Sequence, residues 1–423
     1  MTHRASGWMR NVAGAALLGL MWGTGPAAAG PNHGWVETWS ASPQPVWAPD
    51  FFPPVAIPRA LRDQTLRQVA RVSLGGKQVR LRFSNLYGTE PLRIDATHVA
   101  LAGADGSINA GSDRAVTFGG QPSVTIPPGA PALSDPVDLD VPALASLAVS
   151  TYFNDVSPAT TFHNDGKQTA YLSAAGDETG AERFTAAQTF PSRIFLDGIE
   201  VDAKPDDRAL VLFGDSITDG DGSTLDANHR WPDILAERLQ AKGARLAVSN
   251  QGISGARILR DRLGDNALAR FDRDVLAKPG VDRVVLMMGI NDIGWPGSIL
   301  SPKTEPAPSA EDVIAGYKQL IARAHDNGLL IMGATLTPFE DTFAGTPIVG
   351  YYSEAKEIKR QTLNAFIRSG AFDGVIDFDA VVRDPANPKH IRADYDHGDH
   401  LHPNDAGYKA MAESIDLSLL GVR

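Results

Sequence analysis

An uninterrupted apolar run followed by Gly-Asp-Ser constrains the fold of this chain more than any other stretch of the sequence. The run is Leu210-Val211-Leu212-Phe213, and Gly214-Asp215-Ser216 follows it directly. Short continuous apolar runs are typical of strands that are buried on both faces of a parallel sheet. In open α/β sheets, ligands bind beyond the carboxyl ends of such strands. The pattern therefore predicts that Ser216 lies at a strand end as an accessible hydroxyl, although Asp and Ser are also common turn and cap residues.

From residue 209 to the carboxyl terminus, apolar runs alternate with segments of helical periodicity. We expect strands at residues 210–213, 246–250, 282–288, 329–335 and 375–378. We expect helices at residues 231–242, 267–277, 310–327, 353–368 and 405–420. Five strands that alternate with five helices predict a parallel sheet covered by helices on both faces. The fold class expected for residues 209–423 is therefore α/β.

Residues 35–200 lack this alternation and show short strands separated by Pro and Gly. Residues 77–84 alternate between apolar and polar side chains, and Gly75-Gly76 separates them from the strand-like residues 68–74. A Gly-Gly pair between two strands predicts a β-hairpin. Further strands are expected at residues 97–101, 115–118, 123–126, 147–153 and 168–173. This pattern predicts an all-β, jelly-roll-like sandwich domain at residues 35–200, followed by a polar linker at residues 201–208.

The first 29 residues have the pattern of an export signal. Arg4 and Arg10 precede the apolar residues 12–22, and Ala27-Ala28-Ala29 supplies the small residues of a cleavage site. The apolar run is shorter than the roughly 20 residues that span a bilayer, which favours cleavage near Ala29 over a retained membrane anchor. We therefore expect a secreted or periplasmic protein with no stable membrane insertion after the signal is removed.

The amino-acid composition excludes several kinds of binding partner and of metal or covalent site. The chain has no cysteine, which excludes disulfides, a lipoprotein anchor and thiolate metal sites. A formal net charge of -11 argues against a nucleic-acid partner. Nothing in the sequence indicates an oligomeric state.

Polar clusters follow the first, second, third and fifth predicted strands of the α/β region. They are Gly214-Asp215-Ser216, residues 250–255, Gly289-Ile290-Asn291-Asp292 and residues 399–404. Because the carboxyl ends of parallel strands meet at one edge of a sheet, we expect these clusters to form a single site.

The residue types in these clusters are those of nucleophilic acyl transfer. That chemistry requires a hydroxyl, a base, a carboxylate that orients the base, and donors for the developing oxyanion. We expect Ser216 to be the nucleophile, His402 the base and Asp399 the orienting acid. The backbone N–H groups of Ser216 and Gly252, with the side-chain amide of Asn291, are expected to form the oxyanion hole.

The segment around His402 also contains other candidates. His397 and His400 are alternatives for the base, and Asp394 and Asp396 are alternatives for the orienting acid. Spacing favours Asp399, which could reach the His402 ring in one tight turn. The three histidines could also suggest a metal site, but metal ligands usually come from several segments and no cysteine is present. We therefore expect no metal and no cofactor.

In these four blocks the chain resembles the SGNH (GDSL-type) esterases and acylhydrolases. The four residues that give the family its name correspond here to Ser216, Gly252, Asn291 and His402. The similarity extends from residue 209 to the carboxyl terminus. The resemblance implies a flavodoxin-like three-layer α/β/α fold and metal-independent serine hydrolysis. Residues 267–276 also resemble an exported bacterial branch of the family that carries an amino-terminal β-domain.

The substrate is less constrained than the chemistry. Trp231 and Trp295 follow strand ends and are candidates to line an acyl or sugar pocket, although core packing is an alternative for both. Short-chain or carbohydrate O-acyl esters are favoured as substrates, because the sequence shows little apolar surface of the kind a lipase would need. The alternatives are a lipase-type acylhydrolase acting on lipid esters and a non-catalytic carbohydrate-binding protein on a hydrolase scaffold.

Overall fold

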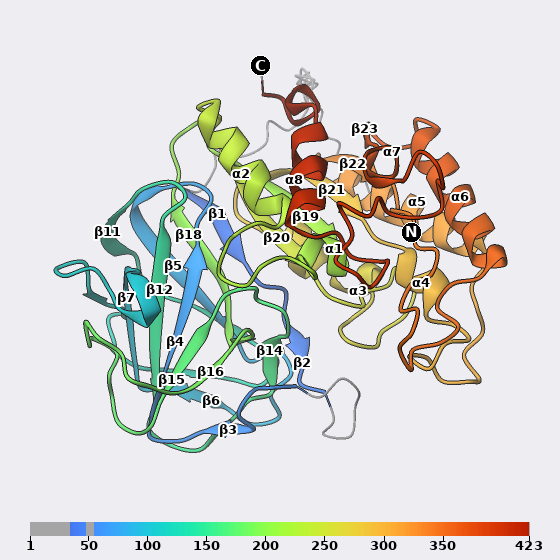
Figure 1. Cartoon of the computed structure of the whole chain (residues 1–423). Helices are drawn as coiled ribbons and strands as arrows, with labels where there is room; N and C mark the ends of the chain where they lie inside the picture. The colour runs from blue at the N-terminus through green and yellow to red at the C-terminus, as the bar shows by residue number, and fades with distance from the viewer. Residues whose placement is uncertain (1–33, 48–54, 423) are drawn as a thin grey trace, which may run out of the picture. The chain divides into compact units, whose positions relative to one another are not determined.

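A five-stranded parallel sheet organises the second half of the chain in the computed structural model (Figure 1). The strand order is β20-β19-β21-β22-β23, and every neighbouring pair is parallel. In chain order this is 2-1-3-4-5, the flavodoxin-like order of doubly wound sheets. The strands are β19 (Arg208–Gly214), β20 (Leu246–Gly252), β21 (Val281–Met287), β22 (Leu330–Ala334) and β23 (Gly374–Ile376). The predicted α/β fold class is confirmed.

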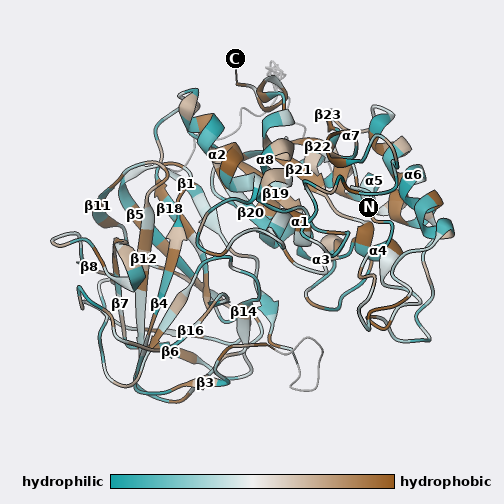
Figure 2. Ribbon diagram, viewed as in Figure 1, coloured by the Kyte–Doolittle hydropathy of each residue, from teal (hydrophilic) through white to brown (hydrophobic). Residues whose placement is uncertain are grey.

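Both faces of this sheet are buried, which explains the continuous apolar run in β19. Leu210 and Leu212 belong to one hydrophobic core, whereas Val211 and Phe213 belong to another. The first core is shared with α2 (Trp231–Ala241), α7 (Phe378–Val382) and α8 (Asp405–Ser414). The second is shared with α3 (Ala267–Phe271), α5 (Ala310–Asp326) and α6 (Glu354–Arg368). Along α2 and α6, hydrophobic and hydrophilic residues alternate, as expected of helices with one covered side (Figure 2).

Several helices differ from their predicted extents. The helix expected at residues 267–277 is α3 followed by a π-helical turn over Asp272–Leu276. The last expected helix ends at Ser414, and a 3-10 turn over Leu417–Leu420 follows it. Two short helices, α1 (Ser216–Asp219) and α4 (Ile290–Gly294), begin directly after β19 and β21. These two helices carry residues of the predicted site.

The preceding region is all-β, as predicted. One antiparallel sheet has the order β1-β18-β5-β10 with β11 also on β5, and a second has the order β16-β15-β4-β12-β7-β8. Both sheets contribute to one hydrophobic core, with Val79 and Leu81 from the first and Leu66 and Val149 from the second. The strands of these two sheets are β1 (Trp35–Ser40), β4 (Gln64–Arg71), β5 (Gly76–Ser84), β7 (Ala96–Leu101), β8 (Arg114–Ala115), β10 (Pro131–Leu133), β11 (Val137–Val141), β12 (Ser146–Phe153), β15 (Ala170–Ser173), β16 (Ala186–Phe190) and β18 (Leu196–Asp202).

Three smaller antiparallel pairings accompany these sheets: β13 with β3, β6 with β9, and β17-β14-β2. Their strands are β2 (Gln44–Pro45), β3 (Ala60–Leu61), β6 (Leu92–Ile94), β9 (Val124–Ile126), β13 (Ser157–Pro158), β14 (Thr161–His163) and β17 (Arg193–Ile194). The loop after β14 reaches the predicted site, as described below.

The hairpin predicted around Gly75-Gly76 is wrong. β4 pairs with β12 and β15, whereas β5 pairs with β18, β10 and β11, so the two strands lie in different sheets. A two-residue hairpin of type I′ needs positive φ at both turn residues, and neither glycine has it. A Cβ on Gly75 would lie 2.2 Å from the carbonyl oxygen of Val141. The glycine therefore permits a close approach to another chain segment instead of a tight turn.

The structure describes residues 34–47 and 55–422. The predicted signal peptide and its cleavage near Ala29 lie outside the described residues, as does part of the chain between β2 and β3. Within the described part, no helix has the length and apolar character needed to cross a membrane.

The β region and the parallel sheet belong to one compact unit, Asn32–Arg423, and contact each other directly. Ser40 of β1 donates from Oγ to the carbonyl oxygen of Asn250 in β20 at 2.9 Å, and Ser73 Oγ donates to Val248 O at 3.0 Å. The domain boundaries at residues 200 and 209 stay a prediction.

Candidate active site

Ser216 lies at the carboxyl end of the central strand β19 and begins helix α1. Asp215 caps this helix, because its carboxylate accepts a hydrogen bond from the backbone N–H of Ile217 at 3.2 Å. A Cβ on Gly214 would lie 2.1 Å from Thr218 Oγ1, so the absence of a side chain at this position allows α1 to pack close to the end of β19. Burial is the main cause that raises the pKa of Asp215 to about 7. Through its hydrogen bond to Ile217, Asp215 fixes the turn that positions the Ser216 hydroxyl.

His402 meets Ser216 from the loop that precedes α8. The Ser216 hydroxyl and His402 Nε2 are 2.8 Å apart, and His402 Nδ1 lies 2.6 Å from Asp399 Oδ2. The other carboxylate oxygen of Asp399 accepts the backbone N–H groups of Leu401 and His402 at 3.0 and 2.9 Å. The structure thus brings together the three predicted catalytic residues in the order hydroxyl, imidazole and carboxylate.

Asp399 and His402 each stabilise the charged form of the other. Burial disfavours the charged form of His402, but the hydrogen bond and charge of Asp399, together with Asp221 and Asp215, raise the pKa of His402 to about 9. Burial likewise opposes ionisation of Asp399, and the hydrogen bond and charge of His402 hold the pKa of that carboxyl well below its usual range. The imidazole is therefore a strong base whose protonated form is stabilised in place.

The rival residues form a separate pair in the same loop. His400 Nδ1 lies 2.6 Å from Asp396 Oδ2, and Asp396 Oδ1 accepts the backbone N–H of His400 at 3.1 Å. Asp394 pairs with Arg392. The hydrogen bond to Ser216 belongs to His402, the base expected from the sequence.

The amide of Asn291, near the start of α4, is held in one orientation. Its Oδ1 accepts hydrogen bonds from Trp295 Nε1 and from the hydroxyl of Tyr351, both at 2.8 Å. Its Nδ2 donates one hydrogen to the carbonyl oxygen of Ala256 at 3.1 Å. Because both acceptor positions are occupied, the amide cannot flip, and its second N–H stays available.

Ser216, His402 and Asn291 line a cavity of about 300 Å³. Most of its wall is apolar or aromatic, and a polar side is formed by Asn164, Asp221 and Ser254. The apolar residues are Trp47, Leu263, Trp295, Leu300, Phe343, Ile348, Tyr351 and Leu401. The β region contributes Trp47, whose Nε1 donates to Leu263 O at 2.9 Å, and Asn164.

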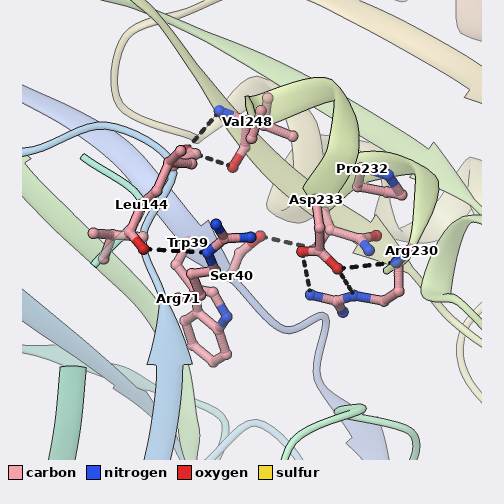
Figure 3. Close-up of a pocket in the computed structure, with 12 residues that line it drawn as sticks. Trp39, Ser40, Arg71, Leu144, Arg230, Pro232, Asp233 and Val248 are labelled. Carbon is pink, nitrogen blue, oxygen red and sulfur yellow. Dashed lines mark hydrogen bonds and ion pairs between the residues drawn. The ribbon is translucent and has the colours of Figure 1, made fainter. Parts of the chain in front are cut away.

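A second cavity, between the β region and α2, is too small for a substrate (Figure 3). Its volume of about 20 Å³ has room for about one water molecule. Arg71 donates to Leu144 O on one side, and Arg230 pairs with Asp233 on the other. The cavity lined by Ser216, Asn291 and His402 is therefore the candidate active site.

Residues 212–410 match the model of the GDSL-like lipase/acylhydrolase family. This segment is a GDSL-like acylhydrolase domain. The match confirms the resemblance drawn from the sequence blocks and makes the protein a carboxylic ester hydrolase.

Several solved structures are similar to about half of the chain. The aryl esterase of M. smegmatis is 17% identical over 51% of this chain and 100% of its own, with a TM-score of 0.40. The lipase/acylhydrolase of Enterococcus faecalis is 20% identical over 51% of this chain and 96% of its own, with a TM-score of 0.39. An acetyl xylan esterase is 22% identical over 49% of this chain and 96% of its own, with a TM-score of 0.36. No curated protein sequence matches the chain.

In the acylhydrolase domain, Gly252 does not occupy the place that was predicted for an oxyanion donor. Its backbone N–H donates to Asn250 Oδ1 at 2.9 Å, and it is not among the residues that line the cavity. A Cβ at Gly252 would lie 2.3 Å from the backbone nitrogen of Asp219, so this glycine allows α1 to pack against β20. Gly255, three residues later, lines the cavity with a φ of +77°.

The two tryptophans have different positions. Trp295 lines the cavity of the acylhydrolase domain and donates to Asn291, which fits its predicted place at the substrate pocket. Trp231 is fully buried and packs edge-on against Phe378 with ring centroids 5.3 Å apart. The prediction that Trp231 lines a pocket is therefore wrong, because its helix turns it into the core beside the sheet.

Charged residues from both regions surround α1, and sequence reasoning missed them. His163 Nε2 lies 2.9 Å from Asp219 Oδ1, and Asp219 Oδ2 accepts the backbone N–H of Ser254 at 3.0 Å. Lys167 Nζ lies 3.1 Å from Asp165 Oδ2 and 3.7 Å from Asp221 Oδ1. Asp221 could have been noticed from its position five residues after Ser216, but nothing in the sequence relates residues 163–167 to the site.

Arg270 is a further buried residue that supports the site. It is fully buried and donates to Gly214 O at 3.0 Å and to Gln251 O at 2.9 Å. Asp274, also fully buried, lies 3.0 Å from the same guanidinium. Arg270 therefore ties together the ends of the two strands that precede Ser216 and Gly255.

Within the described residues, no group of three or more His, Asp or Glu side chains is arranged to hold a metal ion. That the reaction needs neither metal nor cofactor stays a prediction.

Proposed function

We propose that this protein is a serine esterase in which Ser216, His402 and Asp399 form the catalytic triad. The observation that carries the proposal is the continuous contact from the Ser216 hydroxyl through His402 to Asp399, inside the cavity of about 300 Å³. The family match to acylhydrolases supports it independently of the geometry. The same geometry argues against a binding protein on a disused scaffold, because binding alone would not require an aligned hydroxyl, imidazole and carboxylate.

In the first half of the reaction, Ser216 Oγ attacks the ester carbonyl carbon while His402 Nε2 takes the hydroxyl proton. Asp399 stabilises the resulting imidazolium through Nδ1–H. The tetrahedral intermediate collapses as the bond between the carbonyl carbon and the alcohol oxygen breaks. His402 then gives its proton to the leaving alcohol, and the acyl group remains on Ser216.

In the second half, water attacks the acyl carbon and gives its proton to His402. Cleavage of the bond to Ser216 Oγ releases the carboxylic acid, and the proton returns to the serine. Three donors are proposed for the oxyanion in both halves: the N–H of Ser216, the free N–H of the Asn291 amide, and the N–H of Gly255 in place of Gly252. The N–H groups of the first helical turn have no acceptor within the helix, which suits that of Ser216 to this role.

The wall of the cavity favours an apolar acyl group. Trp295 and Tyr351 both donate to Asn291, and a Cβ on Gly255 would contact Leu263 and Trp295, so aromatic and aliphatic side chains surround the proposed oxyanion donors. Ile299 and Val349, which neighbour two of the lining residues, are 65% and 68% exposed. These features support a linear acyl chain longer than acetyl, in contrast to the short-chain preference expected from the sequence.

The test is hydrolysis of p-nitrophenyl esters from acetate to palmitate by the purified protein and its Ser216→Ala variant. We expect a maximum at butyrate to octanoate and loss of activity in the variant. Ser223→Ala is the matched control, because Ser223 lies in the same segment and its Oγ donates to Gly220 O without lining the cavity. Undiminished hydrolysis by Ser216→Ala would exclude Ser216 as the nucleophile.

A further inference from the structure

A second carboxylate lies beside the atom of His402 that transfers the proton. Asp221 Oδ2 is 3.8 Å from His402 Nε2, and Asp221 lines the cavity with its side chain 31% exposed. Ser254 Oγ lies 3.1 Å from the same oxygen. Asp399, in contrast, contacts the other nitrogen of the ring. Asp221 is therefore placed to touch a substrate group, not to orient the imidazole.

The β region holds Asp221 in its ionised form. Burial, and then the charge and hydrogen bond of Asp221, raise the pKa of Asp165 to about 8. Desolvation opposes ionisation of Asp221, but the hydrogen bond of Asp165 and the charges of His402 and Lys167 lower its pKa. Lys167 contacts both carboxylates. Asp221 is thus the more acidic of the two carboxyl groups, and it faces the cavity as a hydrogen-bond acceptor.

Asn164 adds a second polar group to this side of the cavity. Its backbone N–H donates to Gln44 Oε1 at 2.8 Å, and its carbonyl oxygen accepts from Ser192 Oγ at 2.6 Å. The backbone is therefore fixed, while the side-chain amide makes no hydrogen bond to another described residue. An amide can both donate and accept, which suits recognition of a hydroxyl group.

The place of the leaving alcohol follows from the proposed mechanism. Its oxygen must lie within hydrogen-bond distance of His402 Nε2, about 2.6–3.2 Å, to receive the proton. Asp221 Oδ2 lies 3.8 Å from that same nitrogen. A hydroxyl on the carbon adjacent to the ester-bearing carbon can therefore reach Asp221 while the ester oxygen remains at His402. The acyl side is the apolar wall around Asn291, described above.

We propose that Asp221, assisted by Asn164, selects esters whose alcohol carries a hydroxyl on the carbon adjacent to the ester-bearing carbon, that is, monoesters of polyols. This inference rests on the proposed esterase function. The hydroxyl donates to the Asp221 carboxylate, and the Asn164 amide binds a further oxygen of the polyol. The substrate class is then an apolar acyl group on a polyol.

The test compares two esters of the same acid, ethyl butyrate and 2-hydroxyethyl butyrate, by titration of the released acid. We expect the wild-type protein to favour the hydroxylated ester by about 10-fold or more in kcat/KM, the value of a hydrogen bond to a charged acceptor. Asp221→Asn is expected to reduce this ratio to less than about 3-fold. Both esters use the same His402, so an effect of Asp221 on the pKa of the imidazole cancels in the ratio.

Asp226→Asn is the matched control. Asp226 lies in the same loop and also binds the β region, through the N–H and hydroxyl of Thr169, but it does not line the cavity. We expect this variant to keep the wild-type ratio. Ester hydrolysis without a preference in the wild type, or equal loss on both esters in Asp221→Asn, would overturn the proposal. Absence of hydrolysis on every ester would instead refute the esterase function on which it rests.

Discussion

The Asp399→Asn substitution tests whether the proposed reaction requires the negative charge of Asp399, and not only a side chain of the same size at that position. The asparagine keeps nearly the same volume, but it removes the negative charge that faces His402 Nδ1 at 2.6 Å. In each tetrahedral intermediate His402 is an imidazolium, so the loss falls on the transition state. The variant should therefore lose turnover and keep its fold.

The expected size of the loss follows from the pKa of His402. This pKa is about 9 instead of the ordinary 6.5, a difference equivalent to about 3 kcal/mol, or about 300-fold in rate. Asp221 and Asp215 supply part of this stabilisation, which lowers the share of Asp399. Asparagine can also favour the wrong imidazole tautomer, an effect that reached about 10⁴-fold in a serine protease. We therefore expect kcat to fall by about 100- to 10,000-fold.

The assay is p-nitrophenyl butyrate hydrolysis, with thermal unfolding measured in parallel. Asp396→Asn is the control, because Asp396 makes the same kind of 2.6 Å contact to His400 in the same loop. The control should keep activity within about threefold of wild type, since its pair does not reach Ser216. A loss below about tenfold in Asp399→Asn, with the fold intact, would refute the charge argument.

Two further predictions concern pH and the link to the β region. His402 must be neutral to accept the Ser216 proton, and its pKa is raised to about 9. Wild-type kcat/KM should therefore increase from neutral pH and level off only above pH 9. A plateau reached near pH 7 would contradict this. His163→Ala should cost about 3 kcal/mol in the free energy of unfolding, because it breaks a buried pair with Asp219. His98→Ala is the control, because its pair with Asp113 is partly exposed and should contribute less than about 1 kcal/mol to the free energy of unfolding. Both variants are measured by denaturant titration. Equal losses of unfolding free energy in the two variants would argue against a special role of the His163 contact.

Much of the parallel sheet was predictable because its signals are local. Leu210–Phe213 form one strand whose alternate side chains enter two cores, so the continuous apolar run follows directly from burial on both faces. The order of the blocks along the chain also identified Ser216, Asn291, Asp399 and His402, because parallel strands bring their carboxyl ends to one edge. The Pro403-Asn404 pair that follows His402 favoured it over His400, although His400 makes a similar 2.6 Å contact with Asp396.

Errors arose where the same local pattern permits more than one tertiary outcome. Gly75-Gly76 is compatible with a hairpin, but β4 and β5 find partners far along the chain in two different sheets. Gly252 and Gly255 are both glycines after β20, and the packing of α1 decides which of them lines the cavity. Trp231 follows a strand end, yet the rotation of its helix buries it completely.

The sequence by itself determined the parallel sheet, the hydrolase chemistry and the choice of residues for the proposed triad, because each depends on neighbouring residues or on strand order. The tertiary structure alone decided the composition of the cavity. Asn164 and Asp221 are 57 positions apart, and Trp47 and Leu263 are 216 apart, yet all four line the same cavity. Such contacts depend on how the β region packs against α1 and β20, which no periodicity in either segment encodes. The polar side of the cavity, and with it the proposed choice of alcohol, therefore became visible only in the folded chain.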